Sequence, residues 1–86
     1  MSLEKLREEV DEIDKKVLEL LSKRKKVVEQ IGKIKQEKHL VINDKNREDE
    51  LIKNVIKKGQ TLGLEEKYLR RLYKEIIKYS KKVQKK

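Results

Sequence analysis

The segment LEKLREEVDEIDKKVLELLSKRKKVVEQIGKI, residues 3–34, decides the fold of this chain. Its apolar side chains recur at alternating steps of three and four residues, which places them on one face of an α-helix. This apolar seam consists of Leu3, Leu6, Val10, Ile13, Val17, Leu20, Val27, Ile31 and Ile34. Ser2 is a suitable N-cap, and nothing interrupts the pattern before about residues 36–43. The sequence therefore predicts one long amphipathic helix.

The length of this helix bears on the number of chains in the molecule. At about 1.5 Å per residue, some 34 residues make a rod of roughly 50 Å. A compact chain of 86 residues has a radius of gyration of only about 12 Å. Because the rest of the chain is too short to cover such a rod, we expect a second chain to pack along the apolar seam.

Two shorter helices are predicted after the long one. Asn43 or Asp44 can cap the second helix, whose apolar face is formed by Leu51, Ile52, Val55 and Ile56. Residues 59–63, which begin and end with glycine, are expected to form a turn. A third helix begins at about residue 65, and its apolar stripe is formed by Leu69, Leu72, Tyr73, Ile76, Ile77, Ser80 and Val83. Residues 1–86 thus read as one all-α domain of a long, a short and a medium helix, with a Lys-rich tail at about 81–86.

Composition restricts the chemistry. The chain has no cysteine, which excludes disulfides, thiolate metal sites and cysteine nucleophiles. Neither a membrane-spanning segment nor a signal peptide is recognised, so a cytoplasmic protein is expected. The formal net charge is +9, with 14 Lys and Arg against 7 Asp and Glu in residues 44–86. This excess favours an anionic partner, although a solvated Lys/Glu-rich helix surface accounts for it equally well.

Polar residues interrupt the apolar faces at a few positions where burial is costly. Arg24 occupies a seam position, and an unpaired charge buried there would be strongly destabilising. Lys35 lies eleven residues later, on nearly the same helix face and roughly 16 Å away. The remaining interruptions are Asp44, Arg47 and Glu48 on the second helix and Ser80 and Gln84 on the third. Singly, each favours a polar layer that sets helix register, whereas together they favour a binding site for a small anion.

The same residues carry a family resemblance. The matching segments are Leu6-Arg7-Glu8 with Ile13-Asp14, Leu20-Leu21 before Arg24, Ile31-Gly32-Lys33 with Lys35, Asn43-Asp44-Lys45-Asn46-Arg47-Glu48, and Ser80 with Gln84. In this order and spacing, over about residues 3–85, the chain resembles the all-helical chorismate mutases. The resemblance implies an intertwined helical homodimer whose two active sites each take one arginine, matching Arg7, from the partner subunit. Arg7 and Arg24 are 17 residues apart, about 25 Å along one helix, too far to grip one small ligand from the same chain.

The resemblance also implies the reaction, a Claisen rearrangement of the dianion chorismate to prephenate in phenylalanine and tyrosine biosynthesis. The reaction is unimolecular, so no nucleophile, cofactor or metal ion is expected. Arg24 and the partner's Arg7 would bind the two carboxylates, and Lys35 and Gln84 would donate to the ether oxygen. Glu48, with the backbone near Asp44, would take the ring hydroxyl. Arg47 and Ser80 would complete the carboxylate-binding shell.

Three alternatives stay open. An isochorismate pyruvate lyase shares the fold and much of the anion-binding set, although the complete set of Lys35, Glu48 and Gln84 favours the mutase. A basic nucleic-acid-binding module would use the Lys-rich third helix, but only three tyrosines are available for stacking on bases. A coiled-coil dimer without a ligand is the third alternative. His39 is expected to be an exposed linker residue, and a glycine at position 32, within a helix, has no explanation in the sequence.

Overall fold

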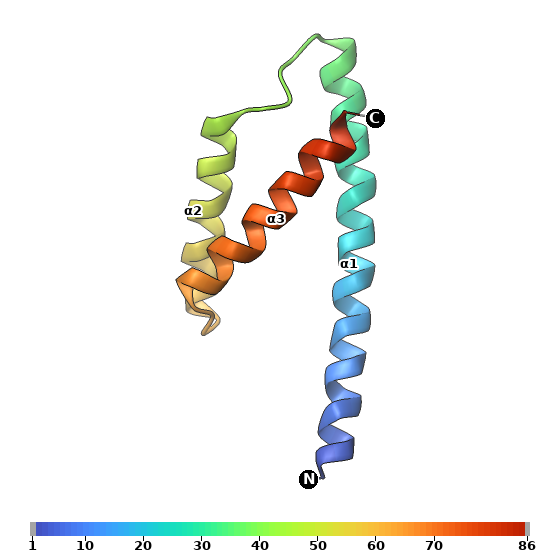
Figure 1. Ribbon diagram of the computed structural model, residues 1–86, viewed down its shortest axis with the longest axis vertical. Coiled ribbons are helices and arrows are strands. Elements are labelled where there is room, and N and C mark those ends of the chain that lie inside the picture. Colours follow the sequence, from blue (N-terminus) through green and yellow to red (C-terminus); the bar gives the residue numbers. More distant parts are fainter. Residues whose placement is uncertain (1, 86) are drawn as a thin grey trace.

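The computed structural model describes residues 2–85 and contains, over that range, three α-helices (Figure 1). They are α1 (Leu3–Glu37), α2 (Lys45–Thr61) and α3 (Glu66–Gln84). No strand occurs in the described part of the chain, which confirms the all-α prediction of a long, a short and a medium helix. None of the described helices is long and apolar enough to cross a membrane.

The helix ends follow local capping chemistry. The Ser2 side chain accepts a hydrogen bond from the Lys5 amide at 3.2 Å, and Asp44 accepts one from the Arg47 amide at 3.1 Å. Each satisfies an amide that has no partner within its helix. Of the two cap candidates for the second helix, Asp44 is the one used. The predicted cap at Ser2 is also confirmed.

Helices α1 and α2 end in the same backbone motif. The Leu40 amide donates to the Lys35 carbonyl at 2.8 Å, and the Leu64 amide donates to the Gly59 carbonyl at 3.0 Å. In each case the preceding residue is left-handed, His39 with φ 56° and Gly63 with φ 81°. This is the Schellman arrangement, in which a left-handed residue ends the helix. His39 is exposed, as expected, but it also has this conformational role.

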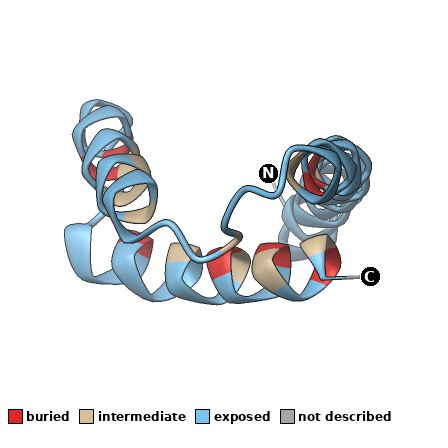
Figure 2. Cartoon of the chain, turned by 90° about the horizontal axis from the view of Figure 1, so that it is seen from above, coloured by how far each residue is buried: buried red, intermediate tan, exposed pale blue. Residues whose placement is uncertain are grey.

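Helix α3 crosses the molecule and contacts both other helices, whereas α1 and α2 do not contact each other within the described residues (Figure 1). The small core lies along α3, as the buried positions in Figure 2 show. Its apolar members are Val28, Ile56, Leu69, Ile77 and Val83. Helix α3 packs against α1 through the face that carries Val28 and Gly32, beside the apolar seam.

The N-terminal end of α1 projects beyond the other two helices (Figure 1). Every residue from 3 to 23 is exposed, and the apolar seam is uncovered along its whole length. The molecule measures 55 × 24 × 16 Å, and its radius of gyration is 15.9 Å instead of the roughly 12 Å of a compact chain. The described chain therefore leaves its most regular apolar surface in contact with solvent.

One local expectation needs correction. The turn expected at residues 59–63 is shorter, because α2 continues through Gly59 to Thr61. Gly59 is buried, and a Cβ there would collide with the Leu69 side chain, so this glycine permits close packing of α2 on α3. The Lys-rich segment at 81–86 is helical as far as Gln84, and its last residue, 86, lies outside the described part.

Candidate active site

Polar residues that interrupt the apolar pattern gather where α3 crosses the C-terminal part of α1. Arg24 of α1 is half-buried, and its Nη1 donates a hydrogen bond to Oγ of Ser80 on α3. Ser80 is only 7% exposed, and its hydroxyl donates in turn to the Ile76 carbonyl at 2.8 Å. The serine therefore uses its proton within its own helix and presents a lone pair to Arg24. Because no carboxylate of residues 2–85 pairs with Arg24, its charge remains available to an anion.

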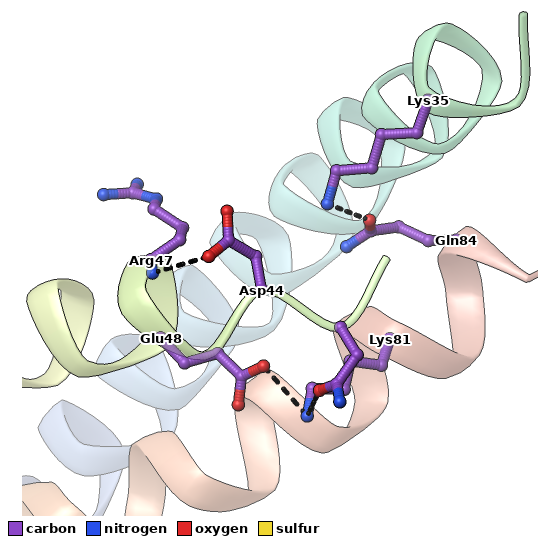
Figure 3. A network of polar contacts seen from close by, with 7 residues as sticks. Lys35, Asp44, Arg47, Glu48, Lys81 and Gln84 are labelled. Carbon is purple, nitrogen blue, oxygen red and sulfur yellow. Dashed lines mark hydrogen bonds and ion pairs between the residues drawn. The ribbon is translucent and has the colours of Figure 1, made fainter. Parts of the chain in front are cut away.

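A second contact joins α1 and α3 nearer to the C-terminal ends of both helices. Lys35 Nζ of α1 donates to Gln84 Oε1 of α3 at 2.8 Å (Figure 3). Since an ammonium group can only donate, Gln84 turns its carbonyl oxygen to Lys35 and keeps its NH₂ group free to donate elsewhere. Lys35 also retains further N–H groups. The pair thus presents two kinds of donor, one charged and one neutral, to the same region.

Gly32 sets how closely α3 approaches α1 at this pair. A Cβ at position 32 would lie 2.9 Å from Cα of Gln84 and 3.0 Å from its carbonyl oxygen. Such distances are shorter than van der Waals contact, and the obstructing atoms belong to the backbone, which cannot rotate away. The glycine that the sequence left unexplained is therefore required for the close approach of the Gln84 backbone.

Glu48 lies across from these residues, in the first turn of α2 (Figure 3). Its Oε2 is 2.9 Å from Nζ of Lys81 on α3. The same ammonium group donates to Asn43 Oδ1, in the linker before α2, at 2.8 Å. Sequence analysis missed Lys81 because it falls in a run of lysines at the end of the chain. No local signal in the sequence distinguishes Lys81 from the neighbouring lysines.

Asp44 and Arg47 lie near Glu48, but their side chains are engaged locally. The Asp44 carboxylate caps α2, and its backbone N–H donates to the Ile42 carbonyl at 3.1 Å. The Arg47 side chain is 62% exposed and lies 3.8 Å from the Glu50 carboxylate. Figure 3 shows it pointing away from Glu48 and Lys81. The structure therefore does not bring the Arg47 guanidinium into the cluster.

Arg7 is also separate from the cluster. It lies on the exposed N-terminal half of α1, 17 residues before Arg24 and about 25 Å from it along the helix. Between α1 and α3, a groove of about 350 Å³ includes Arg24 and Ser80 but is otherwise mostly apolar. Its main apolar lining consists of Leu21, Val28, Leu72, Ile76, Tyr79 and Val83. The groove and the adjoining cluster lie on the part of α1 that is distant from Arg7.

The arrangement can bind an anion and supply hydrogen-bond donors to it. Arg24 offers a planar fork that suits a carboxylate, and Lys35 offers a compact charge that suits a single oxygen atom. Glu48 adds an acceptor on the opposite side. The described residues contain no group of three or more His, Cys, Asp or Glu side chains placed to bind a metal ion. The cluster therefore suits a small, multiply charged organic anion that also carries a hydroxyl group.

Comparison with known proteins identifies a family whose sequence pattern this chain matches. The family model described as "Chorismate mutase type II" matches residues 6–85. The bifunctional chorismate mutase/prephenate dehydratase of Buchnera aphidicola from Acyrthosiphon pisum is 36% identical over 80 residues, which are 93% of this chain and 21% of that protein. For the protein of the same name from Escherichia coli K12, identity is 35% over 75 residues, 87% of this chain and 19% of that protein. The chain thus spans about a fifth of the length of these relatives.

Two further matches cover most of both proteins. A protein named chorismate mutase from Methanocaldococcus jannaschii is 28% identical over 83 residues, which are 96% of this chain and 84% of that protein. A solved structure of a conserved hypothetical protein from Pyrococcus furiosus is similar with a TM-score of 0.78 and 35% sequence identity. That match covers 95% of this chain and 93% of the other.

Proposed function

The chain belongs to the chorismate mutase type II family, and from this premise we propose that it catalyses the rearrangement of chorismate to prephenate. The observation that carries the proposal is the junction of α1 and α3, where Arg24 and Lys35 meet Ser80 and Gln84. Chorismate is a dianion, and its rearrangement breaks an ether bond on which negative charge develops. An unpaired guanidinium and a Lys–Gln donor pair match those two requirements.

The proposed mechanism requires binding and electrostatic stabilisation, without a covalent intermediate. Arg24 binds a carboxylate and holds the substrate in the compact conformer that the reaction needs. The Lys35 ammonium and the free Gln84 NH₂ group donate to the ether oxygen as charge accumulates there. The Glu48 carboxylate accepts a hydrogen bond from the ring hydroxyl, which also contacts the backbone near Asp44. Hydrogen bonds that strengthen in the transition state in this way raise the turnover rate itself.

Ser80 and Arg47 have auxiliary roles in this proposal. Ser80 orients Arg24, since its hydroxyl accepts from the guanidinium. Arg47 would complete the carboxylate-binding shell by a change of side-chain rotamer, because its guanidinium is exposed and held only by a surface ion pair with Glu50. No cofactor takes part in these steps.

We further propose that the protein acts as a homodimer in which Arg7 reaches the site of the partner subunit. Two observations support this. The apolar seam of α1 is exposed along its length, and such a surface is typical of an interface between chains. Arg7 is also too far from Arg24 to reach the same small ligand within one chain. The cytoplasmic location expected from the sequence stays a prediction.

The test is an assay of the purified protein with chorismate, followed by loss of substrate absorbance and by acid conversion of prephenate to phenylpyruvate. Arg24→Ala is compared with Arg71→Ala, which removes an exposed arginine of α3. We expect turnover by the parent chain, a loss of about 100-fold or more in kcat/KM for Arg24→Ala, and little change for Arg71→Ala. A folded parent protein without turnover would contradict the proposal, and isochorismate would then be the next substrate to assay.

A further inference from the structure

Lys81 joins three segments of the chain by one ammonium group. From α3 it reaches Glu48 in the first turn of α2, at 2.9 Å, and Asn43 in the linker, at 2.8 Å (Figure 3). The Lys81 and Glu48 side chains are 32% and 24% exposed, so both are largely shielded. Oε2 of Glu48 is fully buried and accepts no hydrogen bond of good geometry, which leaves the adjacent ammonium as the group that compensates its charge.

This contact differs from the other ion pairs in the described residues. Arg47 with Glu50 and Arg70 with Glu66 connect neighbouring turns of one helix, and their side chains are about half exposed or more. Exposed pairs of that kind contribute little to stability. The Lys81 contact instead connects residues 33 and 38 positions apart in sequence. It therefore constrains how separate segments are placed relative to one another.

Among the described helices, only α3 packs against α2, the helix that carries Glu48. Helices α1 and α2 have no mutual contact in the described chain, so α3 is the element that relates Glu48 to Arg24 and Lys35. Helix α2 packs closely on α3 at Gly59 and Leu69. Gly59 lies eleven residues beyond Glu48, about 16 Å along the helix. At the Glu48 end, the contact with Lys81 adds a polar link between α2 and α3.

We propose that Lys81 is a positioning residue for the mutase reaction, which holds the Glu48 carboxylate and the Asn43 linker over the substrate site and acts through Glu48. This inference rests on the function proposed above. Lys81 fulfils this role because an ammonium group has three donors, enough to hold the carboxylate and the amide oxygen at once. It does not need to touch the substrate.

The test is a double-mutant cycle between Lys81 and Glu48, read as kcat/KM for chorismate. The variants are Lys81→Met, Glu48→Ala and the double variant, with Lys81→Arg to restore a cation and Lys82→Met as the matched control. Lys82 is the next residue of the same helix, is exposed and forms no ion pair in the described residues, so it controls for loss of one positive charge. Thermal unfolding of every variant accompanies the kinetics.

We expect Lys81→Met to lower kcat/KM by about tenfold in the parent background and to have almost no further effect in Glu48→Ala. Lys81→Arg should restore most of the activity, and Lys82→Met should stay within about twofold of the parent. Equal effects of Lys81→Met in both backgrounds would overturn the inference, because the lysine would then act independently of Glu48. Normal activity of Lys81→Met would overturn it as well.

Two outcomes separate this inference from the proposed function. If the parent chain does not turn over chorismate, the proposed function fails and the inference fails with it. If the parent is active and Lys81→Met is equally active, the function stands and the inference alone is wrong. Should Lys81→Met not fold, Lys81→Gln, which removes the positive charge but keeps a polar side chain, replaces it in both backgrounds, and Lys81→Arg remains the restoring variant.

Discussion

Gly32 has no Cβ, and the Cβ of any other residue at this position would collide with the Gln84 backbone. Gly32→Ala should favour α1 as an isolated helix by about 1 kcal/mol. The added methyl group nevertheless forces α3 away from α1 beside the Lys35–Gln84 pair, and overpacking of this kind costs about 1–3 kcal/mol. Because a displacement of about 1 Å can lower a rate 100-fold, we expect a small change in thermal unfolding and a loss of at least about tenfold in kcat/KM.

Gly59→Ala is the matched control for that prediction. It adds the same methyl group at a buried helix position, but against the Leu69 side chain and at the end of α2 away from Glu48. It should therefore lower the unfolding temperature while leaving kcat/KM much closer to the parent value. Parent-like activity of Gly32→Ala would show that the Lys35–Gln84 distance does not depend on this glycine.

Gln84 is a neutral donor at every ordinary pH, so the parent activity should not fall away above neutral pH. Gln84→Glu replaces the NH₂ donor by a carboxyl group, which donates only while it is protonated and ordinarily has a pKa of about 4.3. The variant should thus be most active in acid and lose activity as the pH rises through that pKa. The measurement is kcat/KM against pH for both proteins. A flat profile for the variant would contradict donation from this side chain.

At the scale of residues, sequence reasoning found the members of the cluster that interrupt an apolar pattern. Arg24 and Ser80 stand out because a polar group replaces an apolar one at a regular spacing, and the structure brings these two together. Lys81 belongs to no such pattern, since one lysine in a run of lysines carries no local signal. Its significance depends on α2 lying opposite, which is a tertiary fact.

Helices α1 and α2 end in the same motif with different residues at the left-handed position. His39 has a Cβ and pays the steric cost of φ 56°, whereas Gly63 has none at φ 81°. We expect His39→Gly to stabilise the protein by up to about 1 kcal/mol and Gly63→Ala to destabilise it by about 1 kcal/mol. A Cβ at position 63 would meet nothing within 4 Å, so this change tests conformation without a steric clash.

The measurement is chemical denaturation of both variants at one protein concentration. Destabilisation by His39→Gly would mean that the imidazole makes a compensating interaction. Since His39 lies four residues after Lys35, kcat/KM should be recorded too, and an unchanged value would show that the cap affects stability alone.

At the scale of elements, hydrophobic periodicity and capping residues predicted the three helices and most of their ends. The expected turn at residues 59–63 was partly wrong because glycine has two uses that look alike in sequence. Gly63 supplies a left-handed backbone, while Gly59 lets Leu69 approach closely. The second use depends on a residue in another helix, which local sequence does not reveal.

The proposal of a dimer makes a prediction for the whole molecule. If each site combines Arg24 of one chain with Arg7 of the other, Arg7→Ala and Arg24→Ala homodimers should both be nearly inactive. A mixed dimer then has one site with both arginines and one site with neither. Because half of the dimers in an equal, re-equilibrated mixture are mixed, activity should recover to about a quarter of the parent value.

The measurement is kcat per chain after joint unfolding and refolding of the two variants, with the separately refolded variants as controls. Light scattering of the parent protein gives the number of chains directly. A mixture no more active than its components would contradict sharing of the site between subunits.

The elongated shape of the whole chain was predictable from the length of the first helix. A helix of 35 residues cannot be enclosed by the remaining residues, and the radius of gyration of 15.9 Å agrees with that expectation. The sequence did not predict which face of α1 packs against α3. The apolar seam is the more regular stripe, but Val28 and Gly32 provide the depression into which α3 fits, and packing depends on shape as well as on apolarity.

The lack of contact between α1 and α2 has a consequence for the growing polypeptide on the ribosome. Synthesis proceeds from the N-terminus, and a folding unit becomes stable only when its contacting elements have all emerged. In the described chain α3 follows α1 and α2 and is the element that each of them contacts. A nascent chain that stops before residue 66 therefore carries two helices with no tertiary partner and an uncovered seam. During translation, the face of α1 that carries Val28 and Gly32 stays exposed until α3 has been made, and the apolar seam stays exposed even then.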